Sequence, residues 1–212
     1  MQVRTTALAA LVAAAISSAA VSSAGAQIIY DNGSTDSLNG NEMTQWFQAE
    51  DFSLGAAANI GRVQFWAGEF TAFGGFQGSV SYAFHADNGG VPGATLFSGT
   101  VVPTTRTFIG TASWGGDEYF YEFNVSANLG PGNYWLALHN GPTNFTTRTE
   151  MYWSTTSFNA TLPGMEDQDP FGDGGWFSNG QEHAFVLLAP VPEPSSIALL
   201  GVGGLLALRR RR

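Results

Sequence analysis

The sequence contains no cysteine and no lysine among its 212 residues. Without cysteine the chain forms no disulfide framework and offers no thiolate to a metal or a substrate. Without lysine it has no side-chain amine for a Schiff base. The G-x-S-x-G, H-E-x-x-H and phosphate-loop motifs are missing as well, so the common catalytic classes have no signature in this sequence.

Basic residues are scarce, and most of them lie in the terminal segments. Of the eight arginines, five are close to the two ends: Arg4, Arg209, Arg210, Arg211 and Arg212. The interval 27–190 keeps three arginines against sixteen acidic residues, a formal net charge of −13. Such a polyanion repels nucleic acid and anionic lipid, so neither is expected as a binding partner of this interval.

The N-terminal residues show the three regions of a signal peptide in the usual order. Arg4 supplies the basic region, an apolar run extends from Ala7 to Ile16, and Ala24-Gly25-Ala26 matches the A-x-A cleavage pattern. We therefore predict a signal peptide over residues 1–26, which signal peptidase removes before Gln27. A buried N-terminal helix is the alternative, but the order of the three regions favours export.

The last residues combine two prolines, a short apolar run and an arginine cluster. As a helix, residues 195–208 would be about 21 Å long, a minimal span for a hydrocarbon core of about 30 Å. Arginines stay on the cytoplasmic side of a membrane, so the cluster at 209–212 would leave the preceding domain outside. We therefore predict a short C-terminal transmembrane helix over 195–208.

The motif Pro192-Glu193-Pro194, the apolar segment and the arginine cluster together resemble the PEP-CTERM sorting signal over residues 191–212. The cluster consists of Arg209, Arg210, Arg211 and Arg212. The resemblance implies that exosortase, a membrane-embedded enzyme, recognises Pro192, Glu193 and Pro194 and cleaves nearby. It also implies a transient stay in the inner membrane, then transfer to the cell surface or extracellular matrix of a bacterium that makes extracellular polysaccharide. The two prolines suit this role because they keep the recognised segment extended.

The interval 27–190 consists of short runs with period-two alternation, separated by turns rich in glycine, asparagine and proline. In one run Val63, Phe65 and Ala67 share a face, as Tyr134, Leu136 and Leu138 do in another. Ten such runs and no long amphipathic helix predict an all-β domain, an antiparallel jelly-roll-like β-sandwich. The predicted strands are 27–31, 49–54, 62–67, 79–86, 94–102, 105–111, 118–125, 133–139, 149–156 and 183–189.

This interval also resembles the surface β-sandwich domains that commonly precede the sorting signal. The similar stretches are AEDFSLG at 49–55, VQFWAGEF at 63–70, HADNGGVPGATLFSG at 85–99 and LGPGNYWLALHNG at 129–141. They describe strands and turns rather than chemistry, so the resemblance implies a fold and leaves the activity open.

Catalytic residues and histidine metal ligands find little support in the sequence. Glu118 and Glu122 share one strand face, but four residues of strand separate them by about 13 Å. Glycosidase carboxylates lie about 5–9.5 Å apart, so this pair does not fit, while pairs that meet across strands stay open. His85, His139 and His183 lie in predicted strands, where packed histidines are more common than metal ligands. We therefore predict no catalytic residues and no enzyme activity.

The stretch MEDQDPFGDGG gathers four carboxylates, Glu166, Asp167, Asp169 and Asp173, in one glycine-rich region. Calcium takes six to eight oxygen ligands and tolerates irregular loops, so these residues form a candidate calcium site. Their spacing matches no EF-hand loop, and a solvated acidic loop is the alternative.

Two tryptophans, Trp66 and Trp135, lie on the strand faces opposite the apolar residues of their strands. Exposed aromatic rings stack on the apolar faces of sugars, so both are candidate carbohydrate-binding residues by analogy with other sandwich folds. The alternative is that both pack under loops or between the sheets, as most tryptophans do.

Three classes of function follow, and we predict the first. It is an exported, non-enzymatic protein of the cell surface or extracellular matrix that associates with exopolysaccharide. The second is a carbohydrate-binding module of the same matrix, which a row of exposed tryptophans would favour. The third is a secreted polysaccharide hydrolase or lyase, which carboxylates converging in a cleft would favour.

Overall fold

The computed structural model describes residues 27–157, 162–167 and 175–191, and one compact unit spans Gln27–Pro190. In the described residues every regular element is a β-strand except one turn of 3-10 helix, η1 (Thr71–Phe73). No helix in this part of the chain has the length and hydrophobicity needed to cross a membrane. The predicted signal peptide (1–26) and the predicted transmembrane helix (195–208) lie outside the described residues.

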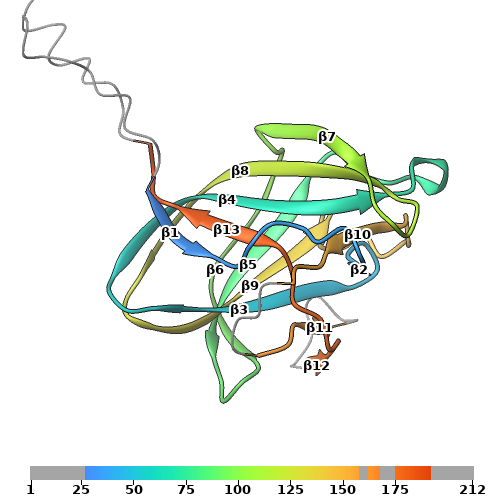
Figure 1. Cartoon of the computed structure of the whole chain (residues 1–212). Coiled ribbons are helices and arrows are strands. Elements are labelled where there is room, and N and C mark those ends of the chain that lie inside the picture. The colour runs from blue at the N-terminus through green and yellow to red at the C-terminus, as the bar shows by residue number, and fades with distance from the viewer. Residues whose placement is uncertain (1–26, 158–161, 168–174, 192–212) are drawn as a thin grey trace, which may run out of the picture. The chain divides into compact units, whose positions relative to one another are not determined.

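The strands form two antiparallel sheets that pack face to face as a β-sandwich (Figure 1). Sheet A has the order β1-β13-β4-β8-β7. Strand β10 pairs with β4 on the same edge as β13, further along β4, and β2 pairs with β10. Sheet B has the order β6-β5-β9-β3-β11-β12. The strands of sheet A are β1 (Ile28–Asp31), β2 (Gly40–Glu42), β4 (Ala58–Glu69), β7 (Thr105–Thr111), β8 (Asp117–Leu129), β10 (Met151–Ser154) and β13 (Phe185–Leu188). Those of sheet B are β3 (Phe47–Leu54), β5 (Val80–Asp87), β6 (Pro92–Val101), β9 (Gly132–Asn140), β11 (Met165–Asp167) and β12 (Phe177–Ser178).

The core lies between the two sheets and is built from the strand faces that the alternation predicted. Val63 and Phe65 of β4 are fully buried in it, as are Leu136 and Leu138 of β9 on the other sheet. Aromatic rings fill much of this space, and Phe65 stacks on Tyr121 with ring centroids 4.8 Å apart. Each such side chain contributes about 1.5–3 kcal/mol when it leaves water, which explains how the sandwich stands without disulfides.

All ten predicted runs contain a strand, and the all-β prediction is confirmed. Three strands were missed: β2 and β11, which have three residues each, and β12, which has two. Such short strands are defined by pairing with longer neighbours, β2 with β10 and β11 with β3. A segment of two or three residues shows no period, so the sequence could not predict these strands.

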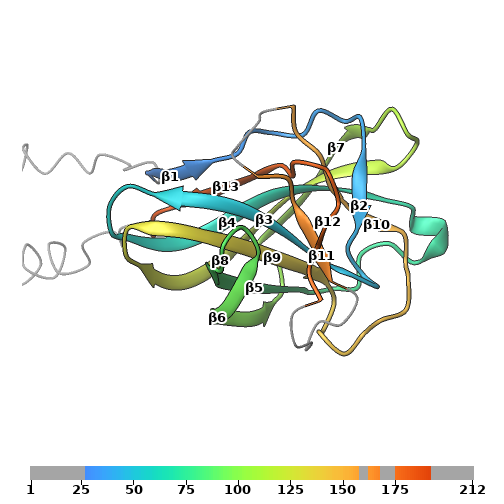
Figure 2. The same ribbon diagram turned by 90° about the horizontal axis from the view of Figure 1, so that it is seen from below.

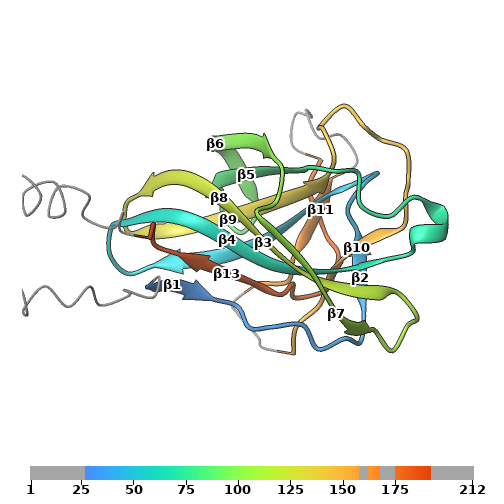
Figure 3. The ribbon, with the colours of Figure 1, turned by 90° about the horizontal axis from the view of Figure 1, so that it is seen from above.

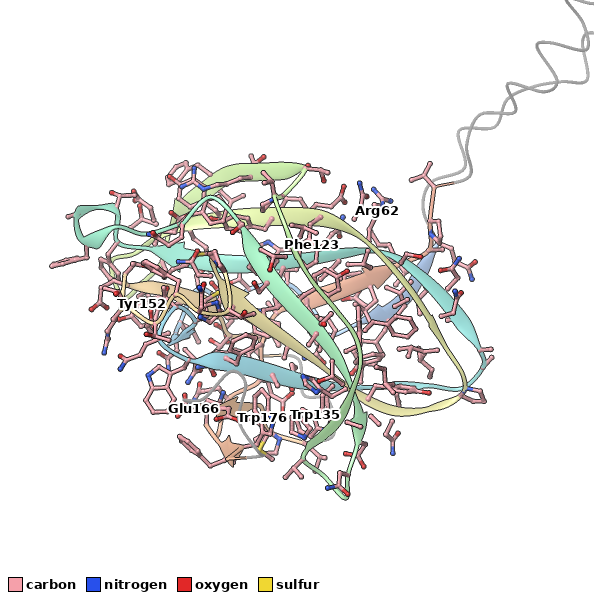
Figure 4. All side chains as sticks on the ribbon, turned by 180° about the vertical axis from the view of Figure 1, so that it is seen from behind. Arg62, Phe123, Trp135, Tyr152, Glu166 and Trp176 are labelled. Atoms are coloured by element: carbon pink, nitrogen blue, oxygen red, sulfur yellow. The ribbon has the colours of Figure 1, made fainter. Side chains whose placement is uncertain are left out.

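The outer face of sheet B carries a second, smaller apolar cluster that the sequence did not predict. It contains Trp135 and Ala137 of β9 and Phe47 of β3, and Val91 and Trp176 pack against it. Figure 4 shows Trp135 and Trp176 on the side of the sandwich that carries β11 and β12. Strand β9 is therefore buried on both faces from Trp135 to Asn140.

The two chain junctions of the domain lie at one end of the sandwich. Ile28 pairs with Leu188, and the backbone N–H of Ala189 donates to the carbonyl of Gln27 at 2.8 Å. The β3–β4 and β8–β9 turns lie at the same end, as Figures 2 and 3 show from below and from above. Pro190 packs directly on Gly61 of β4.

The contact between Gly61 and Pro190 leaves no room for a side chain at Gly61. A Cβ added there would overlap the backbone N and Cα of Pro190, which are part of the main chain and cannot swing away. We expect Gly61→Ala to lower the free energy of unfolding by about 1–3 kcal/mol in urea titrations. Gly55→Ala is the matched control, because a Cβ there meets nothing within 4 Å. Equal stabilities of the two variants would contradict this account.

Candidate functional site

The outer face of sheet A carries an aromatic pair flanked by polar side chains. Trp66 on β4 and Phe120 on β8 are directly opposite each other, with ring centroids 5.5 Å apart and planes at 62°. Both are half-buried, so each ring keeps part of its surface in water. Further along the same two strands, Gln64 faces Glu122. We call Arg62, Gln64, Trp66, Phe120 and Glu122 the outer platform.

Glu122 organises the polar half of the outer platform. Gln64 Nε2 donates to Glu122 Oε2 at 2.7 Å, and Arg62 Nη1 donates to Glu122 Oε1 at 3.1 Å. The side chains of Arg62 and Glu122 are 20% and 16% exposed, so their outer edges stay accessible to a ligand. Thr105 and Thr107 of β7 lie beside Glu122 and Phe120 and add hydroxyl groups. The outer platform therefore combines an apolar aromatic surface with amide, guanidinium, carboxylate and hydroxyl groups.

Glu118, on the same face of β8, is buried and has a structural role. Its two carboxylate oxygens accept hydrogen bonds from the hydroxyls of Thr35, Ser37 and Ser154, at 2.5, 2.6 and 2.7 Å. These bonds hold the segment between β1 and β2 against the outer face of sheet A. Glu118 and Glu122 therefore share a face, as predicted, but each is occupied by its own set of donors.

A third carboxylate, Glu69 at the end of β4, is held in a buried ionic cluster. Arg106 of β7 binds it through Nη2 at 2.9 Å and Nε at 3.1 Å, and the hydroxyl of Tyr121 donates to the same carboxylate. Burial, with the adjacent Glu69 charge, raises the pKa of Tyr121. The Arg106 guanidinium also lies 3.8 Å from the ring centre of Tyr119. The cluster ties the edge strand β7 to the core.

The three histidines do not converge, and each is packed within the fold. In the described residues no group of three or more histidine, aspartate or glutamate side chains is placed to hold a metal ion. His139 stacks on Phe47 with ring centroids 4.6 Å apart, and His85 lies 3.1 Å from the carbonyl of Gly93. Burial lowers the pKa of both histidines, which keeps them neutral.

His183 forms a fully buried pair with Glu50 of β3. Its Nδ1 lies 2.8 Å from Glu50 Oε2, and its Nε2 lies 3.1 Å from Asn41 Oδ1. Burial lowers the pKa of His183 to about 3 and raises the pKa of Glu50 well above its ordinary value. The folded pair therefore holds one proton, on Glu50, from about pH 3 up to the raised pKa of Glu50.

The proton that the folded pair holds makes the stability of the domain depend on pH. In the unfolded chain, with pKa values near 4.5 and 6.5, the two groups hold two protons below pH 4.5, one between these values and none above 6.5. The contribution of the pair to stability is therefore level from pH 4.5 to 6.5. It falls as pH rises above 6.5, by about 1.4 kcal/mol per pH unit until the raised pKa of Glu50 is reached, and it also falls as pH drops below 4.5.

Glu50→Gln removes the proton that the folded pair retains. We expect urea titrations from pH 6.5 up to the raised pKa of Glu50 to show the decline in the unsubstituted protein and a level profile in Glu50→Gln. Other buried groups such as Glu42, whose pKa burial also raises, contribute equally to both proteins and cancel in the difference. Parallel profiles of the two proteins would contradict the assignment of the proton to Glu50.

A hollow of about 190 Å³ on the outer face of sheet B is lined in part by two aspartates. Its lining is Asp51, Ser53, Asp87, Asn133 and Leu162. Asp87 Oδ1 accepts hydrogen bonds from Trp135 Nε1 at 2.9 Å and from the Gly90 N–H at 3.0 Å, so it holds the β5–β6 turn. Pockets for small molecules have volumes of about 300–1,000 Å³, so this hollow is smaller than a substrate cleft.

The two predicted carbohydrate-binding tryptophans have different outcomes. Trp66 lies on the outer platform, half-buried on the predicted face. Trp135 also points to the outer side of its sheet, but it is completely buried under the cluster that includes Trp176. It offers no ring face to a ligand, so its assignment as a sugar-stacking residue was wrong. The alternation correctly predicted its face, but not the segment that covers it.

The predicted calcium site is described only in part. Glu166 and Asp167 lie in strand β11 rather than in a loop, and Glu166 Oε2 accepts a hydrogen bond from Gln48 Nε2 at 3.2 Å. Successive residues of a strand point to opposite faces, so these two carboxylates do not face one ligand together. Asp169 and Asp173 lie outside the described residues. The calcium site therefore stays a prediction.

Phe120 is the aromatic residue of the outer platform that sequence reasoning missed. It lies between Tyr119 and Tyr121, which point toward the core, so its outward position follows from the alternation of β8. Its pairing with Trp66 depends on the register between β4 and β8, and a bulge between Ile60 and Arg62 shifts that register. The alternation could have indicated an exposed phenylalanine, but not its partner.

The described residues define the class of this protein as a two-sheet β-sandwich, whose last strand ends at Leu188, shortly before the C-terminal segment. Residues 190–212 match the PEP-CTERM protein-sorting motif, so the chain carries that motif. Comparisons with curated proteins and with solved structures gave no match. The resemblance of the tail to the sorting signal is thereby confirmed.

The motif marks an exported protein that exosortase sorts and that is anchored transiently in the membrane before cleavage. The predicted recognition residues Pro192, Glu193 and Pro194 lie in the matched region. The predicted cytoplasmic cluster lies in it as well, and its members are Arg209, Arg210, Arg211 and Arg212. All seven residues are outside the described part of the chain, so their roles follow from the motif and not from observed contacts.

The predicted signal cleavage site lies at the edge of the described chain. Ala24 and Ala26 precede the described residues. Gln27, the predicted first residue after cleavage, begins them and accepts a hydrogen bond from the Ala189 N–H through its carbonyl. Cleavage before Gln27 therefore stays a prediction, and it would leave the paired end of β1 intact.

Proposed function

We propose that this chain is a non-enzymatic protein of the cell surface or extracellular matrix that associates with extracellular polysaccharide through the outer platform. The observation that carries the proposal is the pairing of Trp66 with Phe120 beside the Gln64–Glu122–Arg62 network. A sugar ring has apolar C–H faces and a rim of hydroxyl groups. Aromatic surface suits the faces, and paired amide, carboxylate and guanidinium groups suit the hydroxyls.

Charge supports a neutral polysaccharide as the ligand. The interval 27–190 has a formal net charge of −13, which disfavours acidic polymers as it disfavours nucleic acid. On the outer platform the charges of Arg62 and Glu122 balance each other. A neutral polymer approaches this surface without a Coulombic penalty.

A non-enzymatic role is supported by three buried carboxylates that are already held by structural partners. Glu118 accepts three hydroxyl hydrogen bonds, Glu69 binds Arg106, and Glu50 is paired with His183. A general acid or base has to contact a bound substrate in order to exchange protons with it. These three carboxylates are buried and cannot make that contact. In the hollow beside Asp51 and Asp87, which a hydrolase or lyase could use, Asp87 is engaged by Trp135.

The fold is compatible with this role, and we propose that it is a jelly roll. Without the short strands and β7, sheet A has the order β1-β13-β4-β8 and sheet B the order β3-β9-β5-β6. Successive strands of the chain then alternate between the sheets, apart from the β5–β6 hairpin, as in a fold of two Greek keys. Lectin domains use this architecture, which is an analogy of fold and not of site.

The proposal is tested by binding of the exported protein to polysaccharides in affinity gel electrophoresis. We expect Trp66→Ala to lower the affinity for neutral polysaccharides, read from the retardation, about tenfold. This corresponds to about 1.4 kcal/mol of binding free energy, which is usual for a central aromatic contact. Phe120→Ala should act in the same direction. Phe73→Ala is the control, because Phe73 is a 67% exposed aromatic residue in η1, away from the outer platform. Unchanged retardation of Trp66→Ala would refute the assignment of the binding surface.

A further inference from the structure

The end of the sandwich from which the sorting motif departs is formed by small, uncharged residues. Two turns meet there, because Leu54 pairs with Gly132 and Ala58 pairs with Leu129. Ile28 is 57% exposed and Val191 is 51% exposed beside the paired ends of β1 and β13. We call residues 55–59, 128–133 and 189–191 together with Ile28 the tail-side end.

The charge of the domain is distributed away from the tail-side end. Of its sixteen acidic residues, none lies in the sequence intervals 52–68 and 123–149, which include both turns. The exposed turn residues are glycine, alanine, asparagine and proline. Arg62 is the nearest cation on β4, and it is neutralised by Glu122. A domain with a formal net charge of −13 thus has one end that carries no net charge.

The tether between this end and the recognised residues is very short. Pro190 packs on Gly61, and the matched sorting motif begins at residue 190. A fully extended chain spans at most about 3.3–3.6 Å per residue, so Pro192 lies within about 7 Å of Pro190. Pro194 lies within about 14 Å of it by the same measure. An enzyme that holds residues 192–194 is therefore within contact distance of the tail-side end.

We propose that the tail-side end is a docking surface for exosortase, which it contacts while Pro192-Glu193-Pro194 is bound for cleavage. The short tether brings the domain against the enzyme, and an end without acidic residues can be covered by the enzyme without burying unpaired charge. Small side chains allow close approach of the two backbones. The inference rests on the sorting motif and does not depend on the proposed association with polysaccharide.

The test places negative charge on the tail-side end of the full chain and follows the rate of tail cleavage in cells that process the unsubstituted protein. We expect the double variant Ala56→Glu, Ala57→Glu to be processed at least about tenfold more slowly in pulse-chase experiments, because charges buried in a contact without partners weaken it. Thr146→Glu, Thr147→Glu is the matched control. It adds the same charge to exposed residues of the β9–β10 loop, at the other end of strand β9. We expect normal processing of this control.

Two further variants separate docking from misfolding. Asn59→Asp, Asn133→Asp adds charge at exposed positions of the same end with almost no change of shape and should also slow processing. A ten-residue Gly/Ser spacer inserted between Pro190 and Val191 of the Ala56→Glu, Ala57→Glu chain adds about 17 Å of flexible reach. We expect the spacer to raise processing to the rate of the unsubstituted chain that carries the same spacer, which it would not do for a domain that fails to fold.

Three results would overturn the proposal. The first is normal processing of both charged variants, and the second is equal slowing of the β9–β10 loop control. The third is a defect of Ala56→Glu, Ala57→Glu that is lost when exosortase is reconstituted in vesicles of zwitterionic lipid, since the contact would then be with anionic lipid. A defect that persists in such vesicles and is relieved by the spacer supports docking on exosortase.

Discussion

Replacing Pro192, Glu193 and Pro194 with alanine is expected to leave an unprocessed, membrane-bound precursor. These residues lie in the region that matches the PEP-CTERM protein-sorting motif. Two prolines keep the segment extended and prevent it from joining the apolar helix predicted after it, whereas three alanines favour a helix. The expected effect is complete, because an enzyme that binds an extended peptide is offered a helical one.

The measurement is the size and location of the protein after fractionation of cells into membrane and external material. The unsubstituted chain should appear outside in its shorter form, and the triple alanine variant should stay in the membrane at full length. Pro142→Ala is a suitable control, because it replaces an exposed proline outside the motif. Release of the triple variant at the normal size and rate would refute the role assigned to these three residues.

Glu118→Ala is expected to cause the largest loss of stability among the buried carboxylates discussed above, about 3 kcal/mol or more. Glu118 is 2% exposed and accepts hydrogen bonds from three hydroxyls. Hydrogen bonds to charged groups are worth about 1.5–3 kcal/mol each, and unpaired buried donors add a further penalty. The substitution should also release the segment around Thr35 and Ser37, which would exchange its amide hydrogens faster.

Smaller deletions at the same cluster provide a graded comparison with Glu118→Ala. Thr35→Val and Ser37→Ala each remove one donor and leave the carboxylate with two others, so each should cost about 1 kcal/mol. Urea titrations of the exported protein measure all three variants. If Glu118→Ala lowers the free energy of unfolding by no more than Thr35→Val or Ser37→Ala, Glu118 is not the centre of this network.

The long strands could be predicted from the sequence because their pattern is local. Alternation marked Val63 and Phe65 as core residues of β4, and both are fully buried. The same rule marked Leu136 and Leu138 of β9 correctly. Alternation says which side chains share a face, however, and it does not say what lies on the other side of that face. This is why Trp135 was a candidate for sugar stacking although it is buried.

The candidate site was less predictable because its contacts join distant parts of the chain. Glu122 accepts hydrogen bonds from Gln64, which is 58 residues away in the sequence, and from Arg62, which is 60 residues away. No periodicity encodes such pairs, since they arise from the order of the strands in the two sheets. The sorting motif was predictable for the opposite reason. Its recognition residues, apolar segment and arginines are contiguous, so their order in the sequence is itself the signal.

Two surfaces of the domain then have separate tasks. The outer platform, on the broad outer face of sheet A, is proposed to hold polysaccharide, and the tail-side end is proposed to contact exosortase during sorting. Trp66 lies on β4 several residues from the turn at 55–59, so the two surfaces use different parts of the same strand. Substitutions at one surface should leave the other function unchanged.

The most direct test of the central claim is co-sedimentation of the exported protein with the extracellular polysaccharide of the cells that produce it. The account predicts that the protein sediments with the intact polymer, that it is released when the polymer is depolymerised by an added enzyme, and that the protein alone creates no new reducing ends. A protein that stays in solution in the presence of the intact polymer, or that shortens the polymer by itself, would contradict it.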